Sequence, residues 1–507
     1  MFRWTKHVRF RQHPHKRRQT GGQQITSHTK RVRVMPLYMR QFFQDTTIQG
    51  LRYIVAPKRH PFEMLLWAAI ILVASLGAIF VITGSWERYV TNPTVMSLEK
   101  DYRQWATFFP AVTMCFLENL NYTRADQEIK KLWGDVEESK MQYYRDFLNA
   151  LTNASLHNLN EFEKFRNDTT LDKITDLEDL ASKVQIDLKY DISFMDEKTR
   201  VKFRRTLTET GLCFTWGSSV GHLFTSRKAS PPSASETLVT SCRYEDLPCG
   251  IRVSKLLSDV KFYVHSTDDL PIIGTNKPHL EFRGSESQVY VQHKQIVASP
   301  ELRRLDPEQR GCLFRDEVKA HRSLFRTSKL PIYTHNLCKM ACRRRMAEKF
   351  CNCIPFFYRT LGDGNICNAK GMACLSSFKH NLTEDVYKRK GQCFCYQECE
   401  STDYAVDSKS TYELDSDYTY SRDSVQFFVG IKIFTKTRLR RDIIYSFEDL
   451  LVSFGGTVTL FLGCSILSSV ELLYYFTLRL GCELWMKYQK KGKTHPLPEV
   501  SPKCSTR

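Results

Sequence analysis

The chain has 507 residues, 42% of them hydrophobic, and carries a formal net charge of +19. Such a charge is typical of proteins that bind nucleic acid or anionic membranes. Its distribution excludes nucleic acid, because residues 1–60 hold 14 Lys or Arg against one acid and residues 477–507 hold seven against two. Each basic segment adjoins a strongly apolar stretch, which is the pattern of the cytoplasmic flanks of membrane proteins.

The first apolar stretch, MLLWAAIILVASLGAIFVI, begins at Met64 and has 19 residues without a charge. A helix of that length covers roughly 29 Å, the thickness of the hydrocarbon core of a bilayer. We predict a transmembrane helix over residues 62–83, preceded by a cytoplasmic basic region, residues 1–61. A signal peptide is the alternative, and the long basic segment in front of the stretch argues against it.

Residues 84–448 are predicted to form a large extracellular domain that mixes helices and strands. Fourteen of the 17 cysteines lie between Cys115 and Cys399, an even number that suits disulfides in an oxidising compartment. Acceptor sequons for N-glycosylation occur in the same region and nowhere else. They are Asn121, Asn153, Asn167 and Asn381.

Periodicity within this domain indicates both element types. Residues 125–210 have helix-like spacing, whereas residues 260–265 and 287–292 alternate between apolar and polar side chains as strands do. Residues 425–434 hold seven apolar residues in ten and predict a strand that leads directly into a second span.

Residues 312–399 form a cysteine-dense unit. From Cys338 the spacing is C-x3-C-x8-C-x-C-x13-C-x6-C-x18-C-x-C-x3-C. Because the two ends mirror one another, we expect disulfide rungs between two antiparallel segments, helical where cysteines are four apart. Zinc is the alternative, although zinc sites usually use C-x2-C to C-x4-C knuckles in a reducing compartment.

The second apolar stretch, LLVSFGGTVTLFLGCSILSSV, runs from Leu450 to Val470 and is rich in Gly, Ser and Thr. We predict a transmembrane helix over residues 449–476, followed by a cytoplasmic tail, residues 477–507. Small and hydroxylated residues suit a helix that packs closely against others or lines water, and composition alone leaves both interpretations open.

These features resemble the degenerin/epithelial sodium channel superfamily, and within it the insect pickpocket channels. The resemblance covers residues 42–475. Its landmarks are FPAVTMC from Phe109, GLCFTW from Gly211, DPEQRGC from Asp306, the cysteine unit, and FGGTVTLFLGCSILSSVE from Phe454 to Glu471.

The resemblance implies an α+β membrane protein with two transmembrane helices and a hand-like, disulfide-rich ectodomain. It implies a homo- or heterotrimeric plasma-membrane channel, with both termini cytoplasmic and membrane lipid around it. Such channels conduct sodium ions, are voltage-insensitive, are blocked by amiloride-like compounds and serve sensory functions. No enzyme activity, cofactor or metal is expected.

The resemblance also implies the cysteine pairing that spacing leaves open. Residues 312–399 would form the stiff thumb of the hand, and Cys242 and Cys249 would pair locally. The remaining pairs would be Cys115–Cys213, Cys312–Cys399, Cys338–Cys395, Cys342–Cys393, Cys351–Cys374 and Cys353–Cys367.

In this family the Gly-x-Ser position of the second span is the selectivity filter, which here is Gly463-Cys464-Ser465. Glycine lets three backbones approach closely and offers carbonyl oxygens to a cation. We expect Ser468 and Glu471 to follow along the same side of one helix, with Glu471 as a cation-attracting ring or a simple interfacial acid. Further pore-lining candidates lie near the outer mouth, where glycines permit bending: Val452, Ser453, and Gly456 of the Gly455-Gly456 pair.

Two departures from the family bear on gating. The family has a His-Gly pair before the first span, and this chain has Gln49-Gly50. Glutamine keeps hydrogen-bonding capacity and loses titration, so a non-conducting accessory or obligate heteromeric subunit is the alternative function. Val452 stands where the family has a smaller residue, and its bulk predicts a leaky pore. A purinergic-type receptor and an ectoenzyme fit less well, because the filter pattern argues against the first and no catalytic motif supports the second.

Overall fold

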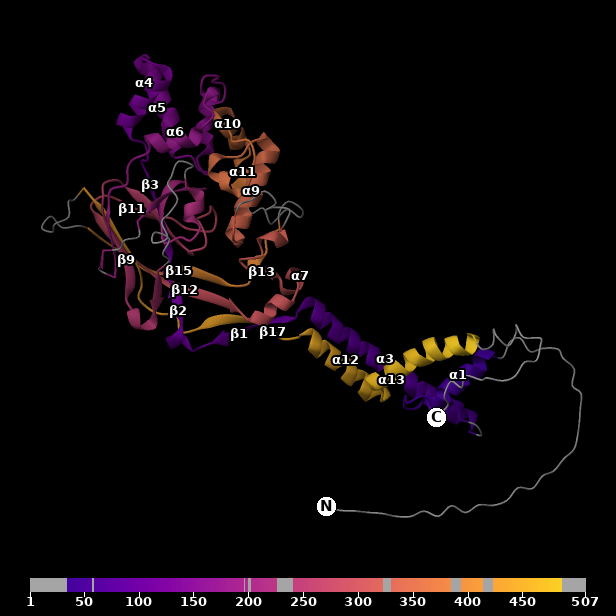
Figure 1. Ribbon diagram of the computed structural model, residues 1–507. Coiled ribbons are helices and arrows are strands. Elements are labelled where there is room, and N and C mark those ends of the chain that lie inside the picture. Colours follow the sequence, from indigo (N-terminus) through magenta and orange to yellow (C-terminus); the bar gives the residue numbers. More distant parts are fainter. Residues whose placement is uncertain are drawn as a thin grey trace, which may run out of the picture. The chain divides into compact units, whose positions relative to one another are not determined.

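A computed structural model of the chain describes residues 34–56, 59–195, 197–198, 202–225, 240–321, 330–383, 394–413 and 423–485. The chain divides into two compact units. Unit 1 comprises Met1–Glu87 and Phe447–Arg507, and unit 2 comprises Arg88–Ser446. Figure 1 labels the elements of both. The predicted regions that precede residue 34 and follow residue 485 lie outside the described residues.

Unit 1 is helical. Its longest helix, α3 (Pro61–Thr91), has 31 residues and contains the predicted first span, which it exceeds at the carboxyl end. Pro61 stands at the first helical position, where its missing N–H costs nothing. By length and composition α3 is the one described helix that could cross a membrane alone; a second crossing requires α12 and α13 to be taken together. The other helices are α1 (Val34–Asp45), α2 (Leu51–Val55), α12 (Phe447–Leu462) and α13 (Ile466–Tyr474).

The second apolar stretch is not the single helix that we predicted. Helix α12 ends at Leu462, α13 begins at Ile466, and the chain bends by 79° between them. Gly455 and Gly456, where we expected bending, lie inside α12. The bend occurs at Gly463 because this residue has φ +63°, a left-handed conformation that ends helices and favours glycine. A π-helical turn, Tyr475–Arg479, follows α13.

Unit 2 is built on two β-sheets. The predicted strands 260–265 and 287–292 are confirmed as β10 (Val260–His265) and the longer β12 (Ser285–Ala298). The third predicted strand is β16 (Val425–Ile431), but it does not lead directly into the second apolar stretch, because β17 (Arg438–Ile443) intervenes.

The larger sheet has the order β1-β17-β12-β16-β9-β4-β5, with β15 also paired to β12. The smaller sheet has the order β11-β10-β3-β7-β6. The bounds of the other strands are β1 (Thr94–Glu99), β3 (Ala111–Phe116), β4 (Asp191–Phe194), β5 (Glu197–Lys198), β6 (Arg204–Thr208), β7 (Gly211–Trp216), β9 (Cys249–Leu256), β11 (His279–Glu281) and β15 (Ser401–Glu413). Two short pairs join β2 (Ala106–Phe108) to β8 (Ser241–Arg243) and β13 (Cys312–Leu313) to β14 (Gln397–Glu398).

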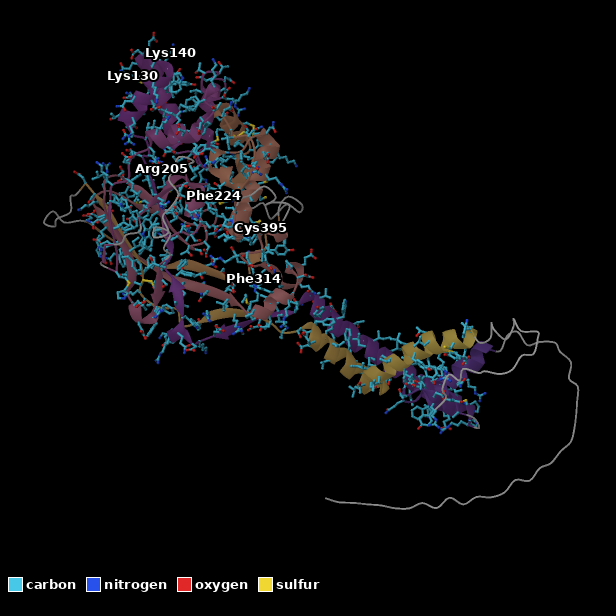
Figure 2. The ribbon with its side chains drawn as sticks, viewed as in Figure 1. Lys130, Lys140, Arg205, Phe224, Phe314 and Cys395 are labelled. Carbon is cyan, nitrogen blue, oxygen red and sulfur yellow. A yellow bond between two sulfur atoms is a disulfide. The ribbon has the colours of Figure 1, made fainter. Side chains whose placement is uncertain are left out.

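Helices from two distant stretches of unit 2 share one core. In Figure 1, α4 (Tyr122–Trp133), α5 (Glu138–Thr152) and α6 (Leu177–Val184) lie near α10 (Ala369–Ser377). Buried apolar residues of these helices and of α9 (His335–Cys351) belong to a single cluster, which includes Phe224, labelled in Figure 2. Two further short helices are α7 (Pro307–Arg310) and α11 (Lys379–Thr383). The helix-like spacing expected over 125–210 therefore holds for α4–α6 and fails from β4 onward.

The described disulfides of the cysteine-dense segment, residues 312–399, join parts of that segment to one another. Cys338 and Cys342 lie one turn apart on α9, as their spacing predicted, whereas the opposing arm contains the short strand β14. Cys342 is disulfide-bonded, and its expected partner Cys393 lies outside the described residues. The described bonds join the pairs that the resemblance implied: Cys115–Cys213, Cys242–Cys249, Cys312–Cys399, Cys338–Cys395 (Figure 2), Cys351–Cys374 and Cys353–Cys367.

Candidate functional site

The expected filter residues form the connection between α12 and α13. Gly463 ends α12, and its N–H donates to the carbonyl of Thr459 at 2.9 Å. This is the one-bond form of a left-handed helix cap. The carboxyl end of α12 carries the negative end of the helix dipole, which favours cations beside it.

Cys464 is the buried member of the connection, with 7% of its surface exposed. Its thiol lies 3.6 Å from the carbonyl of Leu462. Its own carbonyl accepts a hydrogen bond from the hydroxyl of Thr459 at 2.7 Å. The carbonyl of this expected filter residue therefore already has a donor within the chain.

Ser465 caps the amino end of α13. Its hydroxyl accepts from the N–H of Ser468 at 3.3 Å, and the Ser468 hydroxyl accepts from the N–H of Ser465 at 3.3 Å. This reciprocal arrangement is a capping box, which satisfies donors that a helix start leaves unpaired. Ser465 and Ser468 therefore share a local hydrogen-bond motif rather than lying in the middle of one continuous helix.

The turn at Gln49-Gly50, which precedes the first apolar helix, lies beside the connection between α12 and α13. Gly50 has φ +90°, and a Cβ there would lie 3.0 Å from Ile71 of α3, so glycine allows close packing. The side chain of Gln49 lies beside Gly463, where an added Cβ would be 2.6 Å from its Cδ. The structure thus brings together the residues expected to govern gating and those expected to select ions.

Glu471 contacts the same segment. Its carboxylate accepts from the hydroxyl of Thr47 at 2.6 Å and from the Thr47 N–H at 3.3 Å. The Thr47 hydroxyl also lies 3.0 Å from that of Ser468. Sequence reasoning missed Thr47; the available signal was a Thr-Thr pair in a polar turn close to Gln49.

A cavity of about 510 Å³ opens beside the connection. Its walls come from the turn around Gln49, from α3 and from the end of α12. Both polar and apolar residues line it, among them Arg52, Tyr53, Trp67, Ile70, Ile71 and Phe461.

The remaining pore-lining candidates lie on different sides of α12. Val452 is 73% exposed, and Gly456, one turn later, is exposed as well. Ser453 instead lies against α3, with its hydroxyl 3.1 Å from that of Ser85. Val452 and Gly456 therefore share an exposed face, and Ser453 does not.

A second contact between distant segments was not foreseen from the sequence. Tyr38 of α1 donates to the carbonyl of Tyr475 at 2.5 Å, and the Tyr475 hydroxyl donates to Asp45 at 3.0 Å. Arg479 also reaches Asp45 at 3.6 Å. The contact involves the π-helical turn, whose irregular spacing no apolar periodicity reveals.

Unit 2 contains a small acidic cavity of about 230 Å³. Burial raises the pKa of Asp269, Glu398 and Asp403, which all line it. Asp269 accepts from the hydroxyl of Thr334 at 2.8 Å, and the N–H of His335 donates to Glu398 at 2.6 Å. Asp269 and Glu398 thus accept hydrogen bonds from within the fold. The described residues contain no cluster suited to a metal ion.

His265 of β10 is a core residue. His265 is 3% exposed, and its ring nitrogens lie 2.8 Å from the hydroxyl of Thr113 and 2.9 Å from the carbonyl of Ser266. Burial lowers the pKa of His265 to about 4. The hydrogen bonds and the low pKa of His265 fit a structural role in the core.

The four sequon asparagines differ in their surroundings. Asn167 is exposed, whereas Asn121 caps α4 by accepting from the N–H of Arg124. Asn153 ends α5 and donates to the side chain of Asn149 at 3.0 Å. Asn381 is half-buried in α11. Asn167 is the most accessible of the four to a glycan-transferring enzyme.

Comparison with known proteins identifies relatives over nearly the whole chain. The family described as amiloride-sensitive sodium channel matches residues 42–475. The sodium channel protein Nach of Drosophila ananassae is 27% identical over 91% of this chain and 91% of its own length. Pickpocket protein 19 of Drosophila melanogaster is 23% identical over 87% and 90%, and the bile acid-sensitive ion channel of Mus musculus is 22% identical over 88% and 90%.

Proposed function

The chain belongs to the amiloride-sensitive sodium channel family, and from this premise we propose that it is a pore-forming subunit of a sodium-selective channel. This family consists of cation channels, not enzymes, and its members act at the plasma membrane. The proposed channel is voltage-insensitive, is blocked by amiloride and serves a sensory function.

The proposed topology has two spans, α3 and the bent pair α12–α13, with both termini in the cytoplasm. The apolar composition of these helices and the basic terminal segments support it. Unit 2 would then be extracellular, which suits its disulfides and its exposed sequon at Asn167.

The observation that carries the proposal is the break at Gly463–Ser465 inside an apolar stretch. Backbone that leaves a helix at membrane depth is tolerated where it is covered by protein or lines water. Three copies around an axis would surround a narrow passage with glycine backbone, helix-end carbonyls and the hydroxyl of Ser465. Partial negative charge from the ends of three α12 helices would favour cations there.

Glu471 supports the cation preference further. It is half-buried and hydrogen-bonded to Thr47, so its carboxylate is held at one place next to the break. Three such groups around an axis would attract cations at the inner mouth. The interfacial alternative predicts that neutralising Glu471 leaves conductance unchanged.

The test is whole-cell current from this chain expressed alone, with surface labelling to measure delivery. We expect a current that sodium carries, that a large organic cation does not carry, and that amiloride blocks. Ser465→Cys should abolish the current or reduce its sodium selectivity, whereas Gly455→Ala, inside α12 at a position where an added Cβ meets no atom within 4 Å, should not. A current with unchanged selectivity in Ser465→Cys would contradict the filter assignment.

The accessory-subunit alternative rests on Gln49. Its side chain lies against Gly463. The resemblance implies a titratable histidine at this position of the sequence, and Gln49 cannot titrate. Abundant surface protein without current would favour this alternative. Gln49→His would then be expressed to ask whether the imidazole restores conduction.

A further inference from the structure

Thr459 makes two contacts that its single hydroxyl hydrogen cannot satisfy together. Its Oγ1 lies 2.7 Å from the carbonyl oxygen of Gly455, one turn back in α12, and 2.7 Å from the carbonyl oxygen of Cys464. A threonine hydroxyl donates one hydrogen, and neither carbonyl can donate in return. The hydrogen is therefore either shared between the two carbonyls or donated fully to only one of them, so the helix and the connection between α12 and α13 compete for it.

A neighbouring threonine shows that helix geometry alone does not produce this arrangement. Thr457 also bonds back to the carbonyl four residues earlier, Ser453, at 2.7 Å, as threonines in apolar helices commonly do. Thr457 lies in the middle of α12 and does not reach Cys464. The second contact of Thr459 arises because α12 ends at Leu462 and the chain turns back through Gly463.

The backbone of Thr459 holds the same connection from another side. Its carbonyl accepts the N–H of Gly463 at 2.9 Å, so one residue contacts Gly463 through its main chain and Cys464 through its side chain. Thr459 is itself exposed, which means that a change of its side chain leaves no cavity in a core.

We propose that Thr459 is a positioning residue for ion selection, whose hydroxyl fixes the direction of the Cys464 carbonyl. The inference rests on the proposed function. When the hydrogen is given to Gly455, the Cys464 carbonyl turns without restraint. When it is given to Cys464, the chain fixes the direction of that carbonyl, and the second lone pair of its oxygen remains available to a cation. A carbonyl that is restrained in this way keeps a defined distance from the ion, and selectivity depends on that distance.

The first experiment measures the permeability ratio of sodium to potassium from reversal potentials. Thr459→Val keeps the shape and removes the hydroxyl, Thr459→Ser keeps the hydroxyl, and Thr457→Val removes a hydroxyl that contacts only the helix. We expect the ratio to change by about threefold to tenfold in Thr459→Val, the range that one net hydrogen bond corresponds to. Thr459→Ser and Thr457→Val should stay within about 1.5-fold of the parent chain.

An unchanged ratio in Thr459→Val overturns the inference, and so does an equal change in Thr457→Val. If the parent chain reaches the surface without current, the proposed function fails, and a second measurement decides on Thr459. In the detergent-purified full chain, the Cys464 thiol is labelled with a maleimide, and its peptide is followed by mass spectrometry. Loss of the Thr459 hydroxyl should speed labelling of this buried thiol about threefold or more relative to Thr457→Val; equal rates overturn the inference.

Discussion

One added methyl group at Gly463 should disturb the connection between α12 and α13 in two separable ways. Gly463 has φ +63°, a conformation that costs an L-residue about 1–2 kcal/mol. The new Cβ would also lie 2.6 Å from Cδ and 2.8 Å from Cγ of Gln49. Carbon atoms normally approach to about 3.5–4.0 Å, so the glutamine must move by about 1 Å.

The second cost is smaller than the first, because Gln49 is exposed and flexible. Forcing a side chain away from its preferred rotamer costs about 0.5–1.5 kcal/mol. Gly463→Ala should therefore destabilise this arrangement by about 2–3 kcal/mol, of which the Gln49→Ala background recovers about 0.5–1.5 kcal/mol. The backbone cost remains in both backgrounds.

A double-mutant cycle separates the two costs. Gly463→Ala, Gln49→Ala and the double variant are purified in detergent, and the free energy of unfolding is compared through their thermal midpoints. Gly455→Ala is the control, because Gly455 is helical and an added Cβ there meets no atom within 4 Å. That change should be neutral or stabilising by up to about 1 kcal/mol. The reasoning is refuted if Gly463→Ala is as mild as Gly455→Ala, or if its effect is identical with and without Gln49.

Three further predictions use the same unfolding measurement. The pKa of buried His265 is about 4, below the 6.5 of an exposed histidine. Its neutral form therefore stabilises the fold above pH 6.5, and this stability is lost as the pH falls toward 4. At pH 5 the free energy of unfolding should be lower by about 2 kcal/mol. His265→Asn should flatten this pH dependence, and an unchanged slope would assign it to other groups. Arg343 lies 2.5 Å from fully buried Glu209, so Arg343→Met should lower the free energy of unfolding by about 3–5 kcal/mol, because it leaves a buried carboxylate unpaired. Adding Glu209→Gln should recover most of that loss; no recovery would contradict this explanation. Thr47→Val removes a donor to Glu471 and should lower the free energy of unfolding by about 1.5–3 kcal/mol. Thr47→Ser, which keeps the hydroxyl, is the control. An equal loss in a Glu471→Gln background would mean that the contact contributes nothing.

Local patterns were sufficient where a segment is stabilised by one buried face. Val260 and Phe262 belong to a buried apolar cluster, whereas Lys261 between them is half-buried, which accounts for the alternation. Cysteines four apart at Cys338 required a helix to align them. Strand β17 was missed because its sequence, RLRRDI, looks like a charged loop. Two of its three arginines, Arg438 and Arg440, pair with Glu99 on β1, which lies 339 residues away from Arg438 in the chain. No local pattern can reveal a partner at that distance.

Composition alone does not predict at which glycine the second apolar stretch bends. Gly455-Gly456 and Gly463 are both able to interrupt a helix, and the pair contains more glycine. After Gly456, neither Thr457 nor Thr459 is followed three residues later by a polar side chain, so no reciprocal cap can form. Gly463, by contrast, is followed by Ser465 and Ser468, which cap α13 reciprocally. A break is stable only where both new ends find hydrogen-bond partners, so the serine spacing was the informative signal.

In the Gln49-Gly50 pair, the glycine backbone determines where residue 49 lies, and the side chain of residue 49 determines its chemistry. Gly50 has φ +90° and is packed within 3.0 Å of Ile71, so the turn itself requires glycine. That turn sets the place of residue 49 beside Gly463 whatever its side chain, and the sequence therefore predicts its location but not its effect. An imidazole there would add a charge that depends on pH; the amide of Gln49 keeps the contact and removes that dependence. Relative to the His-Gly pair that the resemblance implies, Gln49 therefore changes the chemistry at the connection between α12 and α13, while Gly50 supplies the packing that brings the two segments together.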